Sequence, residues 1–105
     1  MEIYHYLESL GNLLPDIPAD SIISRSVLKN EQVDITLFGF AEGQELTEHT
    51  SSRPAILYFV NGKARLALGK DEKTAEKETM VYMPPRLPHS IFAETPVTML
   101  LILLR

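Results

Sequence analysis

The chain has 105 residues, 45% of them apolar, no cysteine and a formal net charge of -4 at pH 7. This length and apolar content fit one folded domain and exclude a disordered chain. The absence of cysteine excludes disulfides, thiolate metal sites and a cysteine nucleophile, and it suits a reducing compartment. An acidic chain without a Lys/Arg cluster offers no electrostatic footprint for nucleic acid and little attraction to anionic membranes.

The first residues of the chain predict one short amphipathic helix. Its apolar residues recur at helical spacing and are Ile3, Leu7, Leu10 and Leu14. Pro15 follows them and can stop a helix. No basic segment precedes an apolar one here, so we expect no signal peptide. The longest apolar run, 99–104, is far shorter than the roughly 20 residues of a membrane span, and we expect a cytoplasmic protein.

The remaining residues predict strands and turns. Strand-like segments occur at 21–28, 33–37, 55–60, 63–68, 79–83, 89–94 and 97–104. Asn61-Gly62 is the strongest hairpin signal in the chain, and Gly39 predicts a bulge. Strands of this length and spacing predict an all-β sandwich or barrel. We expect a single domain over 1–105, in which residues 1–18 form the N-terminal helix and lead-in and residues 19–105 form the β-barrel.

The last predicted strand, residues 97–104, is apolar on both faces. A strand of this kind is covered on both sides. In so small a protein the second cover is most easily another subunit, so we expect a homodimer.

Two histidines occupy matching positions in the two halves of the chain, and the first lies in a segment bounded by glycines. Five residues separate Gly43 from His49, and the segment closes at Gly62. This spacing resembles the first motif of the cupin superfamily, small β-barrels whose two motifs converge on one metal. The second histidine of that motif falls on Ser51 and its glutamate falls on Ala55.

The second half resembles the second cupin motif. The proline of that motif falls on Pro84 and its histidine falls on His89, whereas its two glycines fall on Glu78 and Arg86 and its asparagine on Ala93. The resemblance covers about residues 33–104. It implies an all-β fold, the double-stranded β-helix or cupin jelly-roll barrel, here with a short N-terminal helix.

Alternation along regular strands predicts which side chains share the barrel interior with the histidines. The expected ligand pocket is lined by Thr47, Ser51, Ala55, Leu57, Phe59 and Ile91. His49 and His89 are the candidate ligands of one divalent metal (Zn, Fe, Mn or Ni), because neutral imidazole is a good metal ligand. Stable sites usually supply at least three ligands, and the third would come from Glu45, His5 or a partner subunit. The alternative is a pair of hydrogen-bonded core histidines.

Three functions follow from this reading. The first is a cupin-type protein that binds a small, largely apolar or weakly anionic molecule, with the two histidines as the polar end of the pocket. The second is a metal-dependent cupin enzyme of the isomerase, dioxygenase or decarboxylase type, which the resemblance implies. The third is a structural dimerisation module with a filled barrel. We expect no nucleic-acid or membrane partner.

Overall fold

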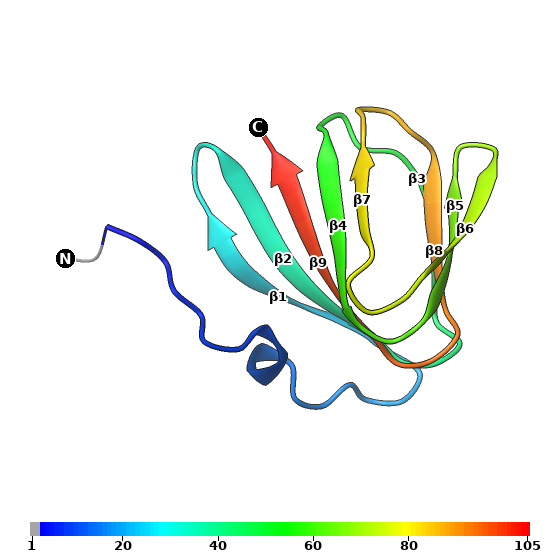
Figure 1. The fold of residues 1–105 in the computed structure, drawn as a ribbon, viewed down its shortest axis with the longest axis horizontal. Coiled ribbons are helices and arrows are strands. Elements are labelled where there is room, and N and C mark those ends of the chain that lie inside the picture. The colour runs from blue at the N-terminus through cyan, green and yellow to red at the C-terminus, as the bar shows by residue number, and fades with distance from the viewer. Residues whose placement is uncertain (1–2) are drawn as a thin grey trace.

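Residues 3–105 are described by the computed structural model, in which two antiparallel β-sheets face each other (Figure 1). The strands are β1 (Ile22–Lys29), β2 (Val33–Phe40), β3 (Glu45–His49), β4 (Ala55–Asn61), β5 (Ala64–Leu68), β6 (Asp71–Ala75), β7 (Met80–Met83), β8 (His89–Ala93) and β9 (Val97–Leu104). The larger sheet has the order β1-β2-β9-β4-β7 and the smaller sheet the order β3-β8-β5-β6. Strands far apart in the chain are therefore neighbours, as in a jelly-roll barrel, and the all-β prediction is confirmed.

The hydrophobic core lies between the two sheets and is formed by alternate residues of the strands. In β4, Ala55, Leu57 and Phe59 are buried while the residues between them are half-buried, and β8 shows the same alternation. The buried residues of the core are Phe40, Ala55, Leu57, Phe59, Ala64, Leu66, Ala75, Met83, Ile91, Ala93, Val97 and Met99. Each sheet contributes one face to this single core, and burial of its apolar surface drives folding.

Two loops lie at the same end of the barrel, the upper end in Figure 1: the β3–β4 loop (50–54) and the β7–β8 loop (84–88). The backbone N–H of Arg86 in one loop donates to the carbonyl oxygen of Ser51 in the other at 2.7 Å. His49 ends β3 and His89 begins β8 beside these loops. We call this end of the barrel the barrel mouth.

The turns of the two motifs have the backbone conformation that favours glycine, including at positions where glycine is replaced. Gly43 and Gly62 have φ of 83° and 93°, and Glu78 and Arg86 have φ of 75° and 67°. A left-handed conformation costs a non-glycine residue roughly 1–2 kcal/mol. Glu78 and Arg86 thus keep the turn geometry of the motif glycines whose places they take.

The N-terminal segment does not form the predicted helix of several turns. One 3₁₀ helix, η1 (Leu10–Leu13), is present, and it buries none of its residues. Ile3 and the residues that follow it are largely exposed and lie off the barrel on the β1 side (Figure 1). A short helix without a docked apolar face is marginal in water, which accounts for the difference. No helix within residues 3–105 is long and apolar enough to cross a membrane.

The N-terminal segment is attached to the barrel at Gly39 of β2. A Cβ atom on Gly39 would lie 2.9 Å from Cγ1 of Ile17, so the missing side chain makes room for Ile17. Nearby, Nη1 of Arg25 donates to the carbonyl oxygen of Leu13 at 3.2 Å. Gly39 pairs in register with Ile23 and with β9, so the predicted bulge at Gly39 is wrong, and the glycine serves close packing instead.

Candidate functional site

The structure brings the two motif histidines together on the inner face of the smaller sheet. His49 and His89 are direct partners across β3 and β8, and their ring centroids are 4.1 Å apart with an angle of 59° between the ring planes. His89 is buried, with 6% of its surface exposed, whereas His49 is exposed at the barrel mouth. The two rings are close enough to contact one bound atom or ligand.

Both imidazole rings are held by the same local hydrogen bond. Nδ1 of His49 lies 2.9 Å from the carbonyl oxygen of Thr47, and Nδ1 of His89 lies 2.8 Å from the carbonyl oxygen of Leu87. A carbonyl oxygen can only accept, so Nδ1 carries the hydrogen in each ring. The Nε2 atoms of the neutral rings therefore keep free lone pairs, the arrangement that orients a histidine for metal binding or for accepting a hydrogen bond.

The environment of His89 favours its neutral form. Burial lowers the pKa of His89 below its usual value of 6.5, and the neighbouring His49 lowers it further, while the hydrogen bond to the carbonyl oxygen of Leu87 acts in the opposite direction. A neutral imidazole is the form that can bind a metal or accept a hydrogen bond at Nε2.

Glu45 lies on the opposite face of the sheet from the histidines. Glu45 pairs with Phe92, and Leu46 pairs with the buried Ile91, but the next pair in the ladder is His49 with His89. Strand β3 thus contains one more residue than β8 between these pairs, and this bulge reverses the alternation that was used to place Glu45 inside. The structure therefore does not bring Glu45, one of the possible third ligands, together with the two histidines.

Thr47 and Ser51 do not line an interior pocket either. Thr47 is exposed in the bulged part of β3 and contributes its carbonyl oxygen to His49. Ser51 is half-buried in the β3–β4 loop, where its Oγ accepts a hydrogen bond from the backbone N–H of Arg53 at 3.1 Å. Both residues support the barrel mouth rather than the barrel interior.

The apolar residues predicted to line the pocket do point into the barrel. Ala55, Leu57, Phe59 and Ile91 are at most 2% exposed and belong to the core cluster. They are part of the packed core between the two sheets.

Three charged residues gather at the mouth end of the larger sheet. Oδ2 of Asp34 lies 3.8 Å from Nη2 of Arg53 and 3.8 Å from Nη2 of Arg105. Asp34 lies in the same cross-strand row as Leu103, Ala55 and Met83, and Met83 is followed by the loop that leads to His89. One carboxylate is thus shared by two guanidinium groups, which leaves a local excess of positive charge.

Local sequence patterns did not single out Asp34 or Arg105 as neighbours of the barrel mouth. Val33, Ile35 and Leu37 are the apolar alternation of β2, yet their partners on β9 are Leu104, Ile102 and Leu100, all outside the core cluster. The spacing of Asp34 and Phe40 could have indicated the face of Asp34. The two residues are six apart, so they share a face of a regular strand, and Phe40 is buried in the core.

The donor set at the mouth fits only a weakly held metal. Within residues 3–105 no group of three or more His, Cys, Asp and Glu side chains is positioned to hold a metal ion. His5 is exposed in the N-terminal segment. The two Nε2 atoms would supply two ligands, and water or a bound small molecule would have to supply the others.

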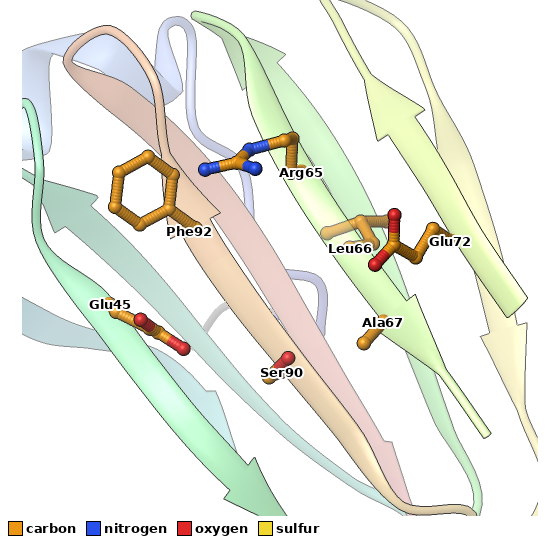
Figure 2. Close-up of a pocket in the computed structure, with 7 residues that line it drawn as sticks. All are labelled: Glu45, Arg65, Leu66, Ala67, Glu72, Ser90 and Phe92. Atoms are coloured by element: carbon orange, nitrogen blue, oxygen red, sulfur yellow. The ribbon is translucent and has the colours of Figure 1, made fainter. Parts of the chain in front are cut away.

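A hollow with a volume of about 250 Å³ lies on the outer face of the smaller sheet (Figure 2). It is lined by Glu45, Arg65, Leu66, Ala67, Glu72, Ser90 and Phe92. The guanidinium of Arg65 lies 4.7 Å from the centre of the Phe92 ring, and its Nε lies 3.3 Å from Oε1 of Glu94. Arg65 is thus already engaged by an aromatic ring and a carboxylate, which explains its position without a ligand.

Comparison with known proteins identifies the fold. No family model matches this chain, and no curated protein sequence matches it significantly. A conserved protein of unknown function from Streptococcus pyogenes is similar in structure, with a TM-score of 0.86 and 24% identity over 97% of this chain and 89% of that chain. A cupin superfamily protein from Desulfitobacterium hafniense has a TM-score of 0.86 and 21% identity, and the match covers 95% of this chain and 94% of that chain. A DMSP lyase has a TM-score of 0.74 and 14% identity, and the match covers 80% of this chain and 47% of that chain.

The chain therefore has the cupin fold, a double-stranded β-helix of two antiparallel sheets. The resemblance of its two histidine motifs to those of small single-domain cupins is confirmed at the level of the fold.

Proposed function

We propose that this protein is a cupin-type small-molecule-binding protein whose ligand enters the barrel mouth and contacts Nε2 of His49 and His89. The observation that carries the proposal is the matched orientation of the two rings, each fixed by an Nδ1 hydrogen bond to a carbonyl oxygen two residues earlier. Adjacent rings with free Nε2 atoms form a polar end above an apolar core.

The charges at the mouth favour a ligand with an anionic group. Arg53 and Arg105 share a single carboxylate oxygen, and their side chains are about a third exposed or less. A guanidinium has several N–H donors and can bind a second carboxylate or a phosphate with those that remain. The expected ligand is small, apolar at one end and weakly anionic at the other.

A divalent metal (Zn, Fe, Mn or Ni) fits the two histidines as a weakly held partner. His49 and His89 would hold it through Nε2, and water or the ligand would complete its coordination. A bound metal would supply Lewis acidity or redox chemistry.

Metal and ligand binding can be tested with protein purified without a polyhistidine tag. We expect calorimetric titration with Zn²⁺ or Ni²⁺ to show about one weak site per chain, because two ligands bind less tightly than three. Replacing either histidine (His49→Asn or His89→Asn) should weaken binding at least about tenfold, the effect expected from losing about 1.4 kcal/mol of binding energy.

The matched control for this titration is His5→Asn, which removes a histidine from the exposed N-terminal segment and should leave binding unchanged. Binding that depends on His5, or that survives loss of both motif histidines, would contradict the proposal.

The second candidate is a metal-dependent cupin enzyme of the isomerase, dioxygenase or decarboxylase type. It is favoured by the open coordination positions that a two-histidine site leaves for a substrate, and one protein of similar fold is a DMSP lyase. This reading requires turnover that depends on added metal and is lost with His49→Asn. The binding protein, in contrast, returns its ligand unchanged.

A purely structural module is distinguished by the double substitution His49→Leu/His89→Leu. If the barrel has no ligand, this variant should differ from the natural chain in stability alone, with no binding lost.

A further inference from the structure

The loop between β7 and β8 turns at Arg86, in a backbone conformation that a bulky residue rarely adopts. The N–H of Leu87 lies 3.4 Å from the carbonyl oxygen of Pro84, and Arg86, the third residue of this turn, has a φ of 67°. A positive φ at the third position is the geometry of a type II turn, in which glycine is preferred. Glycine would adopt this conformation at lower cost, so the turn itself does not require the arginine side chain.

The backbone of this loop is fixed on both sides. The N–H of Arg86 donates to the carbonyl oxygen of Ser51 at 2.7 Å, and the N–H of Gly69 donates to the carbonyl oxygen of Pro88 at 2.8 Å. Three of the five loop residues are prolines, which have a fixed φ, and Leu87 packs against the core. A side chain on a rigid loop binds a ligand with a smaller loss of conformational entropy.

The guanidinium of Arg86 has no charged partner among residues 3–105, since the ion pairs there involve other arginines. The other two arginines of the barrel mouth share the carboxylate of Asp34. Glu48 and Asp71 are exposed at the same end of the smaller sheet, and neither forms an ion pair with Arg86. Arg86 is therefore an exposed cation of the mouth that a ligand can neutralise.

The loop brings Arg86 to the two imidazole rings. Leu87, the next residue, supplies the carbonyl oxygen that holds Nδ1 of His89, and Ser51, two residues after His49, accepts the hydrogen bond from the backbone of Arg86. Because Nδ1 carries the hydrogen in each neutral ring, Nε2 is a hydrogen-bond acceptor. The barrel mouth thus combines a cation with two acceptors, which a ligand with one anionic group and one hydrogen-bond donor would match.

We propose that Arg86 determines the specificity of the barrel mouth and that the ligand is a small hydroxy acid. The guanidinium of Arg86 binds its carboxylate, because these two groups can form two parallel hydrogen bonds. Its hydroxyl group donates to Nε2 of His49 or His89. This inference rests on the proposed function and adds the chemical class of the ligand and the residue that selects it. The strained turn at Arg86 is then part of the binding site.

Three probes that share one aromatic ring test the ligand class. They are 4-hydroxybenzoate, benzoate, which lacks the hydroxyl group, and methyl 4-hydroxybenzoate, which lacks the charge. In titrations followed by NMR chemical shifts, we expect the natural chain to bind 4-hydroxybenzoate at least about fivefold more tightly than either other probe, because each of these loses one contact. Failure of 4-hydroxybenzoate to bind, or equal binding of all three probes, would overturn the proposal.

Arg86→Gln removes the charge and keeps the turn. It should abolish the preference for 4-hydroxybenzoate over its methyl ester and keep the preference over benzoate, whereas His49→Asn/His89→Asn should do the reverse. If Arg86→Gln binds all three probes as the natural chain does, the role of Arg86 is wrong and the proposed function stands. If binding is instead unchanged after loss of both histidines, the proposed function is wrong.

Arg86→Gly separates binding from stability. Because glycine adopts positive φ freely, this variant should raise the midpoint of thermal unfolding by about 2–5 °C and weaken binding of 4-hydroxybenzoate at least about fivefold. The matched control is Glu78→Gly, which replaces a residue with a φ of 75° before the start of β7, at the end of that strand away from the mouth loop. It should raise the midpoint similarly and leave binding unchanged. Equal weakening of binding by both variants, or by neither, would contradict a selecting role for Arg86.

Discussion

His89 combines burial with a titratable ring, and this makes stability depend on pH. Its pKa in the folded protein is lowered from 6.5 by burial and by the adjacent His49. The unfolded chain therefore binds a proton at a higher pH than the folded chain does. Stability from the neutral ring is complete above pH 6.5 and is lost as the pH falls from there through the lowered pKa.

We expect the free energy of unfolding of the natural chain to fall as the pH is lowered below 6.5. The fall should be smaller in His89→Gln, because the glutamine side chain does not bind a proton in this pH range. Denaturant titrations at a series of pH values measure both slopes. The carboxylates contribute equally to the two proteins, so the difference isolates His89. Parallel slopes would contradict the assigned environment of the ring.

Gly62 and Gly43 provide a matched pair of glycines at positive φ. A Cβ atom on Gly62 would lie 2.1 Å from the carbonyl oxygen of Pro96, whereas a Cβ atom on Gly43 would have no atom within 4 Å. Gly43→Ala should cost about 1–2 kcal/mol for the backbone conformation alone. Gly62→Ala should cost about 1–3 kcal/mol more, because the turn must also move away from Pro96.

Thermal or denaturant unfolding of the two alanine variants measures this difference. If both glycines cost the same when replaced, the close approach of Pro96 to Gly62 would not be a constraint on the fold.

At the scale of elements, the attachment of the N-terminal segment depends on the fit of Ile17 over Gly39. We expect Gly39→Ala to destabilise this contact by about 1–3 kcal/mol through overpacking. In an Ile17→Ala background the added Cβ atom has room, so the same substitution should cost much less. Unfolding of the four proteins of this cycle gives the coupling energy.

Additive effects in this cycle would mean that the cost of Gly39→Ala comes from the strand itself. Proteolysis of the N-terminal segment, measured on the same variants, should accelerate in Gly39→Ala if the contact with Ile17 is what holds the segment.

Strand β3 shows how one extra residue changes the chemistry of a whole element. Leu46 and His49 both face inwards although they are three residues apart, because the bulge lies between them. The same bulge turns Glu45 to the outer face, beside Phe92 (Figure 2). A carboxylate that a regular strand would place on the inner face is thereby turned away from the side of the sheet that carries the two imidazoles.

At the scale of the molecule, the two sheets have different surroundings. The outer face of the smaller sheet carries Arg65, Glu72 and Glu45 in a polar hollow, whereas the outer face of the larger sheet is apolar and is flanked by exposed aromatic residues.

Much of the fold could be read from local patterns in the chain. An all-β barrel with its histidines in matching positions was predicted from the apolar run 55–60, the strand-like segment 89–94, the Asn61-Gly62 turn and the spacing of His49 and His89 from their motif neighbours. These features depend on the two-residue period of a strand and on the conformational freedom of glycine, and both act over a few neighbouring residues.

The remaining features were decided by tertiary contacts. The helical spacing of Ile3, Leu7, Leu10 and Leu14 is present, but Ile3 is 93% exposed and the 3₁₀ helix Leu10–Leu13 buries none of its residues. The face of Asp34 depends on pairing with β9, and the face of Glu45 depends on a bulge opposite β8. The two-residue period of a strand divides its residues into two alternating sets. It does not determine which set faces the core, because that depends on pairing with the neighbouring strand and on packing against the opposite sheet.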